Sequence, residues 1–277
     1  GSEMCIRDRQ WTDHSRDRTL DVEIWYPGDQ SIAGQDLDPA TQDAFAPGWA
    51  AGDASDVASV QQAAVRDATP VEGVKPLVLL IHGWAGYRRE ATFLGTHLAS
   101  HGYLVVSPDV CGSTYEDVDA MLRANESENR AQALTEHQNA IARNRQGDIP
   151  FLINMASEHL DADTTAVGVA GPSFGGYSSL VAPAVDRRVA AIAPMCPAGG
   201  AGAPIAAPDD KERRQLLLNF TWHHPVPTLF LVADRDSLLP LHSQLDLLRQ
   251  APTSRKRMVV LANADHNHFC LLYTSPS

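Results

Sequence analysis

One Gly-x-Ser-x-Gly pentapeptide, residues 171–175, constrains this chain more than any other feature. A short apolar run at 167–170 precedes it, and small residues of helical character follow it. A strand that passes through a sharp turn into a helix holds a serine hydroxyl clear of both elements. Glycine is needed on either side, because a Cβ there would collide with the neighbouring strand or helix. The pattern predicts that Ser173 is a nucleophile.

Two backbone N–H groups are expected to face the oxyanion that such a nucleophile creates. The N–H of Phe174 lies at the predicted helix N-terminus, where the helix dipole favours negative charge. A second donor is expected in the loop after an apolar run at 76–81. Gly83 lets the backbone approach a substrate there, and the N–H of Trp84 is the predicted donor. His82 is expected to be a structural histidine beneath the site.

A serine hydroxyl also needs a base and a carboxylate that orients the base. After this type of turn the acid precedes the histidine in the chain. The acid is Asp234 or Asp236, and we favour Asp236 because it lies further past its strand. The base is His266 or His268, which follow the last predicted strand. His-x-His can also bind a metal, but no third ligand is evident, so we expect no metal and no cofactor.

The rest of the chain alternates strands and helices, which predicts one α/β domain with a mostly parallel central sheet flanked by helices on both faces. The first strand is expected to be antiparallel. Expected strands lie at 19–27, 76–81, 103–109, 165–170, 189–194, 227–232 and 257–261. Expected helices lie at 87–100, 128–144, from Asp148 onward with Pro150 in the first turn, and at 241–249.

Three stretches are expected to lie outside this framework. Residues 28–75 are predicted to form a surface insertion, with a short helix at 51–64. Residues 112–127 are predicted to be loop. Residues 197–226 are predicted to form a small mobile lid loop. The helix at 87–100 is expected to present Phe93, Leu94, His97 and Leu98 on one side.

Both ends have unusual sequences. Residues 1–9 and 270–277 resemble translated sequencing-adaptor read-through of a metagenomic open reading frame, so the natural domain is expected to span 10–269. The fold's final helix would then be missing, which would leave the last strand under-covered and favour self-association. With the native start in doubt, a signal peptide cannot be judged, and both a secreted and a cytoplasmic location stay open.

Composition limits the partners. The chain has 277 residues, of which 44% are hydrophobic, and a formal net charge of −12. Such an acidic surface disfavours nucleic acid and anionic membranes. No apolar run reaches the roughly 18 residues that a membrane span needs. Cys111 and Cys196 are expected to stay unpaired, because the strand order of the family that the chain resembles, named below, implies that two strands separate them.

These motifs together resemble the α/β-hydrolase superfamily, nearest to its dienelactone-hydrolase-like branch. That branch includes platelet-activating-factor-acetylhydrolase-like esterases and, as relatives, cutinase-like polyester hydrolases. The resemblance runs over residues 20–269 and rests on 22–27, His82-Gly83, 98–103, 173–177 and 227–240. It implies Asp236 as acid and His266 as base. It also implies that the side chains of Trp84 and Phe174 line the substrate cleft.

Further substrate contacts are expected at Gly83, Tyr87 and Met195. Polyester hydrolases carry a stacking Trp near Met195, and dienelactone hydrolases proper use a Cys nucleophile, so their particular activity is not implied. The expected function is a serine carboxylic-ester hydrolase for short-chain, acetyl-phospholipid-type or polymeric esters. The alternative is a binding protein that has the same fold but no catalysis.

Overall fold

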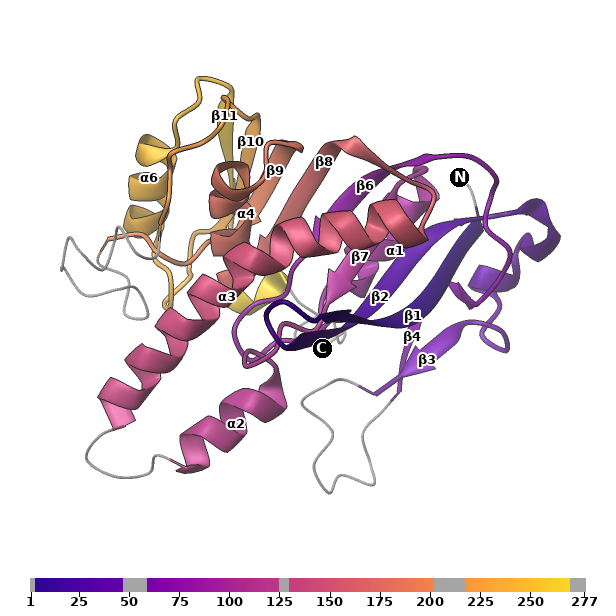
Figure 1. Cartoon of the computed structure of the whole chain (residues 1–277), viewed down its shortest axis with the longest axis horizontal. Coiled ribbons are helices and arrows are strands. Elements are labelled where there is room, and N and C mark those ends of the chain that lie inside the picture. Colours follow the sequence, from indigo (N-terminus) through magenta and orange to yellow (C-terminus); the bar gives the residue numbers. More distant parts are fainter. Residues whose placement is uncertain (1–2, 47–58, 125–129, 202–217, 270–277) are drawn as a thin grey trace.

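A nine-stranded sheet forms the centre of the protein (Figure 1). The computed structural model describes residues 3–46, 59–124, 130–201 and 218–269. The strands follow the order β11-β10-β9-β8-β6-β7-β2-β1-β5. They are β1 (Glu3–Asp13), β2 (Arg18–Gly28), β5 (Val65–Arg66), β6 (Lys75–Leu80), β7 (Leu104–Pro108), β8 (Ala162–Pro172), β9 (Val189–Met195), β10 (Thr228–Ala233) and β11 (Lys256–Leu261).

The six strands from β6 to β11 run parallel, and β2 joins them antiparallel through β7. The buried strands β6 and β7 are near-continuous apolar runs, as expected where both faces of a sheet are covered. This is the α/β-hydrolase fold, which confirms the predicted fold class and the antiparallel first strand. Two strands, β8 and β6, separate Cys111 from Cys196, and both cysteines are free.

Five α-helices are described. They are α1 (Thr92–Ser100), α2 (Tyr115–Ala124), α3 (Arg130–His159), α4 (Phe174–Val185) and α6 (Leu241–Gln250). Helix α4 packs on β8 and β9, and α3 lies across α4 and β8 (Figure 1). The apolar core lies between these helices and the sheet, and it includes Leu79, Val169, Ile192 and Phe230.

Helix α1 begins later than predicted and buries a different face. Residues 87–91 precede it, and its buried residues are Thr92, Gly95, Thr96 and Ala99. Phe93, predicted to lie on the packing side, is 43% exposed. The cause is the Trp25 ring of β2, which lies so close to Gly95 that a Cβ there would approach it to 2.7 Å. The small residues of α1, such as Gly95 and Ala99, therefore mark its packing face, because they let the helix approach the Trp25 ring.

One helix, α3, replaces the two that were predicted between residues 128 and 159. Pro150 lies inside this helix. Asp148 lies inside it too, so it is not a cap, and its carboxylate forms ion pairs with Arg16 and Arg18 at 2.8 and 2.9 Å. The helix stays continuous because its buried stripe keeps helical spacing past the proline. That stripe is Ile141, Ala142, Arg145, Asp148, Ile149, Leu152, Ile153 and Ala156.

One loop prediction and one helix prediction were also wrong. Helix α2 occupies 115–124 in the stretch predicted as loop, and it starts with Glu116 and Asp117, which favour a helix N-terminus. In the insertion, Val60–Gln62 is strand β4 and pairs with β3 (Asp43–Phe45), so the helix predicted at 51–64 is absent there. Residues 51–58 of that prediction and most of the predicted lid, 202–217, lie outside the described residues.

The structure describes the N-terminal segment that was predicted to be a tail, but not the C-terminal one. Strand β1 pairs with β2 from Glu3 to Asp13, and Cys5 and Ile6 are fully buried, so residues set aside as a tail take part in the sheet. Residues 270–277 lie outside the described residues. At the far edge, Val259, Val260 and Leu261 of β11 are 45%, 45% and 39% exposed.

An apolar hollow of about 1190 Å³ adjoins this edge. Its lining includes Leu94 and Leu98 of α1, Val169 of β8, and Leu229 and Leu231 of β10. Val259 pairs with Leu231 in the parallel register, so it lies on the same face as the hollow.

Among the described helices, none combines the length and apolar character that a membrane span requires.

Substitution of Gly95 tests the packing of α1. Gly95→Val should lower the free energy of unfolding by about 1–3 kcal/mol, because the new side chain must displace the buried Trp25 ring. Phe93→Ala on the same helix should change it by less than about 0.5 kcal/mol, because Phe93 is exposed. Urea unfolding of both variants checks this, and equal effects would contradict the packing described.

The exposed β11 edge predicts self-association. Sedimentation of the unaltered chain should depend on concentration, because an apolar edge strand offers unpaired backbone groups and apolar side chains. Val259→Lys should shift the chain toward monomer at the same concentration. Val74→Lys, at a 71% exposed position away from β11, should leave sedimentation unchanged. A chain that sediments as a monomer at every concentration would contradict the prediction.

Candidate active site

The predicted site residues gather at one edge of the sheet. Ser173 follows β8, Asp236 and His266 lie beyond the ends of β10 and β11, and Trp84 lies beyond the end of β6. These four strands are parallel, so their carboxyl ends meet at the same edge. In open α/β sheets this edge is where ligands bind.

The turn at Ser173 has the strained geometry expected of a nucleophile. Its φ is +55° and its ψ is −115°, a conformation that a residue with a side chain rarely adopts. Its N–H donates to the carbonyl of Met195 at 2.8 Å, which fixes the turn against β9. A Cβ on Gly171 or on Gly175 would collide with the carbonyl oxygen of Ile81. The two glycines are thus needed for the reason the sequence suggested.

Asp236 and His266 form a hydrogen-bonded pair. His266 Nδ1 lies 2.7 Å from Asp236 Oδ2, and Asp236 Oδ1 accepts the N–H groups of Leu238 and Leu239 at 2.9 and 2.7 Å. Burial opposes ionisation of Asp236, but the hydrogen bond from His266 and the N–H of Leu239 outweigh it and lower the pKa of the carboxyl. With Nδ1 engaged, Nε2 is the nitrogen left to act as a base.

The alternative residues lie elsewhere. Asp234 is exposed, and His268, whose side chain is 44% exposed, pairs with Asp265 at 2.9 Å. Ser173 Oγ has no hydrogen bond to any side chain in the described part of the chain. Such bonds between a nucleophile and its base are often long before substrate binds.

The loop after β6 lies against Ser173. A Cβ built on Gly83 would lie 3.4 Å from the Cβ of Ser173, so the two segments are in contact here. The first N–H groups of a helix lack partners within it, which leaves Phe174 N–H available at the start of α4. The backbone N–H of Trp84 has no hydrogen bond to the described residues. The two residues predicted as donors are thus neighbours in sequence of Gly83 and Ser173, which lie against each other.

Three buried ionisable groups lie under this loop. His82 Nε2 accepts the N–H of Val110 at 2.9 Å, so Nδ1 carries the proton and donates to the Gly83 carbonyl at 2.7 Å. Burial, together with the nearby Arg145, lowers the pKa of His82 to about 3, which keeps the ring neutral. The expectation of a structural histidine beneath the site is confirmed.

Glu90 and Arg145 were missed in the sequence. Glu90 Oε1 accepts the N–H of Gly83 at 3.0 Å, and burial raises the pKa of Glu90 to about 7, although Gly83, Arg145 and His266 oppose the shift. Arg145 donates to the carbonyls of His82 and Gly83. The sequence offered one signal, namely that Arg145 is a charged residue within the apolar stripe of a helix. That signal does not identify the groups to which the guanidinium binds.

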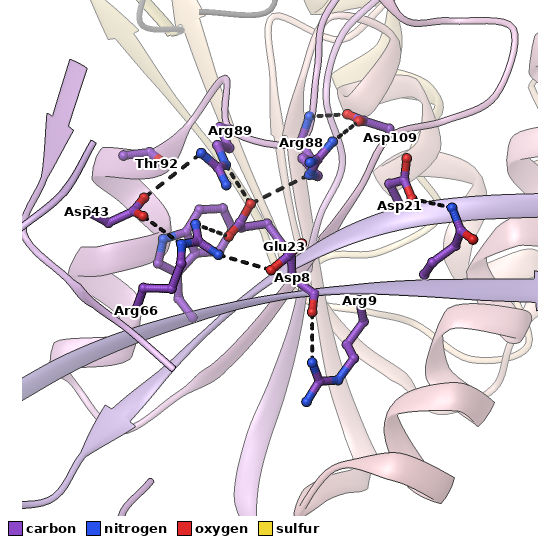
Figure 2. Close-up of polar contacts among 12 residues, drawn as sticks. Asp8, Arg9, Asp21, Glu23, Asp43, Arg66, Arg88, Arg89, Thr92 and Asp109 are labelled. Carbon is purple, nitrogen blue, oxygen red and sulfur yellow. Dashed lines mark hydrogen bonds and ion pairs between the residues drawn. The ribbon is translucent and has the colours of Figure 1, made fainter. Parts of the chain in front are cut away.

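A cluster of ion pairs holds the same loop from outside (Figure 2). Glu23 of β2 is fully buried and lies 3.0 Å from Arg66 Nη2, 3.5 Å from Arg88 Nε and 2.5 Å from Arg89 Nε. Arg88 also pairs with Asp109 after β7. Because Arg88 and Arg89 follow Trp84 closely, this cluster fixes the loop to β2, β5 and β7.

Three predicted cleft side chains are placed differently. The Phe174 side chain is 6% exposed and packs against Tyr177, with ring centroids 5.6 Å apart, so only its backbone faces the site. Met195 is 3% exposed, and its side chain is too buried to present a surface to substrate. Tyr87 packs against Phe45 at 6.5 Å with its hydroxyl buried. Tertiary packing, invisible in a short motif, turned these side chains inward.

Cys196, Asp236 and His266 offer ligand atoms within 4.8 Å of one another. Cys196 is fully buried after β9. The carboxylate of Asp236 is already used by the imidazole of His266, which is the arrangement of an acid that orients a base. Two of these three described residues, Asp236 and His266, are thus the ones that the sequence predicted as acid and base.

A model of the dienelactone hydrolase family matches residues 63–271. The chain belongs to the dienelactone hydrolase family. Because lactones are cyclic carboxylic esters, membership of this family makes the chain a carboxylic ester hydrolase. The family match covers the loop after β6, the serine turn and both the acid and the histidine.

Solved structures show the same fold at low identity. A ferulic acid esterase from Streptomyces cinnamoneus is 24% identical, over 93% of this chain and 73% of its own, with a TM-score of 0.60. A putative dienelactone hydrolase from Klebsiella pneumoniae is 16% identical, over 95% and 88%, with a TM-score of 0.57. An acetyl xylan esterase from Paenibacillus sp. R4 is 13% identical, over 95% and 79%, with a TM-score of 0.58. No curated protein sequence matches this member of the dienelactone hydrolase family.

The raised pKa of Glu90 predicts a pH-dependent stability. The ordinary value is 4.5 and the folded value about 7, so the folded state holds this proton more tightly. The stabilising effect is complete below pH 4.5 and is lost as the pH rises to about 7, a change of about 3 kcal/mol. Glu90→Gln keeps a neutral side chain, so its unfolding free energy relative to the wild type should rise over that range.

Urea unfolding at a series of pH values measures the difference between the two proteins. His82 contributes the opposite slope, because its pKa is lowered, but it is present in both and cancels in the difference. Glu116→Gln, at an exposed position on α2, should give a flat difference. A flat difference for Glu90→Gln would show that Glu90 is ionised normally in the folded protein.

Proposed function

We propose that this chain is a serine carboxylic-ester hydrolase with Ser173 as nucleophile, His266 as base and Asp236 as the orienting acid. The observation that carries the proposal is the 2.7 Å contact between His266 and Asp236 at the sheet edge where Ser173 stands in a strained turn. A histidine in a solvated loop would not be expected to form a hydrogen bond with a buried carboxylate at this position. The alternative residues Asp234 and His268 have no such contact with each other in the described structure.

The first step forms an acyl-enzyme. Ser173 Oγ attacks the acyl carbon while His266 Nε2 takes the hydroxyl proton. The negative charge moves to the carbonyl oxygen, where the N–H groups of Trp84 and Phe174 stabilise it. The C–O bond to the alcohol then breaks, and His266 returns the proton to the leaving oxygen.

The second step releases the acid. Water attacks the acyl carbon, His266 takes a proton from the water, and the oxyanion forms again at the same two N–H groups. The bond to Ser173 then breaks, and the proton passes back to Ser173 Oγ. Asp236 stays ionised throughout and stabilises the imidazolium, which its lowered pKa supports.

The substrate is proposed as a small or polymeric carboxylic ester, with short acyl, acetyl-phospholipid-type and polyester substrates as candidates. Among the fold neighbours, one is a ferulic acid esterase and one an acetyl xylan esterase, which supports aromatic and acetyl esters as first substrates to test. The likeness to platelet-activating-factor-acetylhydrolase-like and cutinase-like enzymes is part of this proposal. Because the side chains of Phe174 and Met195 are buried, Trp84 is the proposed apolar contact with substrate.

A non-catalytic binding protein is the alternative. Fluorophosphonate labelling separates the two, because only an activated serine reacts rapidly with such a probe. Labelling at Ser173 together with turnover of p-nitrophenyl acetate supports the enzyme. Binding of esters without labelling or turnover supports the alternative.

Substitutions at the proposed triad test the roles. Ser173→Ala, His266→Ala and Asp236→Asn should each lower kcat on p-nitrophenyl acetate, the first by on the order of 10⁴-fold or more. The matched changes Asp234→Asn and His268→Ala should stay near the parent rate, because these residues lie outside the hydrogen-bonded pair. Circular dichroism confirms folding of each variant. A Ser173→Ala protein within tenfold of the parent would remove the nucleophile assignment.

A further inference from the structure

Arg145 is a buried cation without a carboxylate partner. It comes from α3 and is 1% exposed, and no described Asp or Glu lies within ion-pairing distance of it. Its Nη1 donates to the carbonyl of His82 at 2.8 Å, and its Nη2 donates to the carbonyl of Gly83 at 3.0 Å. Burial lowers the pKa of Arg145 to about 10, which leaves it charged at neutral pH. The guanidinium also donates to Ser113 Oγ at 2.7 Å and to Ser178 Oγ at 3.4 Å. Neither hydroxyl neutralises a buried charge, which is costly, so the use of this charge on two backbone carbonyls calls for a reason.

The second of these carbonyls belongs to the peptide group that carries the proposed oxyanion donor. The C=O of Gly83 and the N–H of Trp84 are the two ends of one planar unit. A hydrogen bond accepted at the oxygen polarises the unit and makes its N–H a stronger donor. The guanidinium therefore acts on Trp84 N–H through the peptide bond, without touching substrate.

The preceding peptide shows the same arrangement with a carboxyl group in the place of the oxyanion. Its carbonyl, on His82, accepts Arg145 Nη1, and its N–H, on Gly83, donates to the carboxyl of Glu90 at 3.0 Å. A carboxyl group thus occupies, at this peptide, the position that an oxyanion would occupy at the next one. The N–H of Trp84 has no hydrogen-bond partner in the described part of the chain.

Two further contacts fix the orientation of this unit. The Nδ1–H of His82 donates to the Gly83 carbonyl at 2.7 Å and Ser113 Oγ donates to it at 3.5 Å, so with Arg145 that oxygen accepts three donors. The guanidinium carbon of Arg145 also lies 5.5 Å from the centre of the Phe174 ring. Arg145 therefore contacts both segments that supply the proposed oxyanion donors, one through its hydrogen bonds and the other through the aromatic face.

We infer that Arg145 is a positioning residue that orients and polarises the Gly83–Trp84 peptide for oxyanion binding. The inference rests on the proposed function, since it assumes that an oxyanion forms at Ser173. It differs from a purely structural role in one respect. A structural role lowers stability, whereas polarisation of the donor lowers stabilisation of the tetrahedral state at constant folding.

The test compares Arg145→Lys and Arg145→Gln with Asp148→Asn. Lysine keeps the charge but cannot donate to both carbonyls as a fork, and glutamine removes the charge. Asp148, on the same helix, acts on Arg145 through its charge but makes no hydrogen bond to it or to the loop in the described structure. Asp148→Asn therefore breaks the ion pairs that Arg16 and Arg18 make with α3 while the hydrogen bonds of Arg145 stay in place. Each protein is assayed for Tm, for kcat and KM on p-nitrophenyl acetate, and for inhibition by phenylboronic acid, whose serine adduct is tetrahedral.

We expect kcat to fall by about tenfold to a hundredfold in Arg145→Gln and by less in Arg145→Lys, less than the loss of a whole oxyanion donor. KM should change little, and the boronic acid should bind more weakly by a similar factor. Asp148→Asn should lower Tm while leaving kcat and inhibition near the parent values. If Arg145→Gln does not fold, Arg145→Lys decides by the same readouts.

Two outcomes overturn the inference. One is kcat and boronic acid inhibition within about twofold of the parent in the folded Arg145 variants, far below the loss of an oxyanion donor. The other is an equal loss of kcat in Asp148→Asn at a similar Tm, which would assign Arg145 a structural role. Failure of the proposed function is distinguishable, because Ser173→Ala would then keep its activity whatever the Arg145 variants do.

Discussion

The close approach of the β8–α4 turn to the end of β6 is the contact on which the site depends. The carbonyl oxygen of Ile81 occupies the space that a Cβ on Gly171 or on Gly175 would need. Because the backbones touch there, the strained serine is brought against Gly83 of the next loop. The rest of the site follows from strand order, since the parallel strands beyond β8 bring the acid and the histidine to the same edge.

Buried charge holds the loop after β6 on both sides. Glu23 receives Arg88 and Arg89 from outside the loop, while Arg145 and Glu90 bind its backbone from beneath. Each of these groups loses hydration on burial, and hydrogen bonds and ion pairs offset the loss. The gain is geometric, because a loop with several directed contacts keeps its N–H groups in one orientation. Such preorganised donors need no rearrangement when charge develops on a substrate.

Much of the framework could be predicted, because it is encoded in local patterns. The parallel strands were found from apolar runs, and the serine turn was found from its glycines. Helix packing was predicted less well. The face of α1 depends on the Trp25 ring near Gly95, and the continuity of α3 past Pro150 depends on a buried stripe that spans the whole helix. These features come from contacts between distant segments, which hydrophobic period alone does not report.

By itself the sequence determined the chemistry that is available, namely a serine in a strained turn with an acid and a histidine after later strands. It also determined the order of those groups along the chain. Only the tertiary structure brought Asp236 and His266 into contact and left Asp234 and His268 outside that pair, because burial and the 2.7 Å contact exist only after β10 and β11 align. It alone also brought Arg145 beneath Gly83, since this residue is distant along the chain and reaches the loop only when α3 covers the sheet.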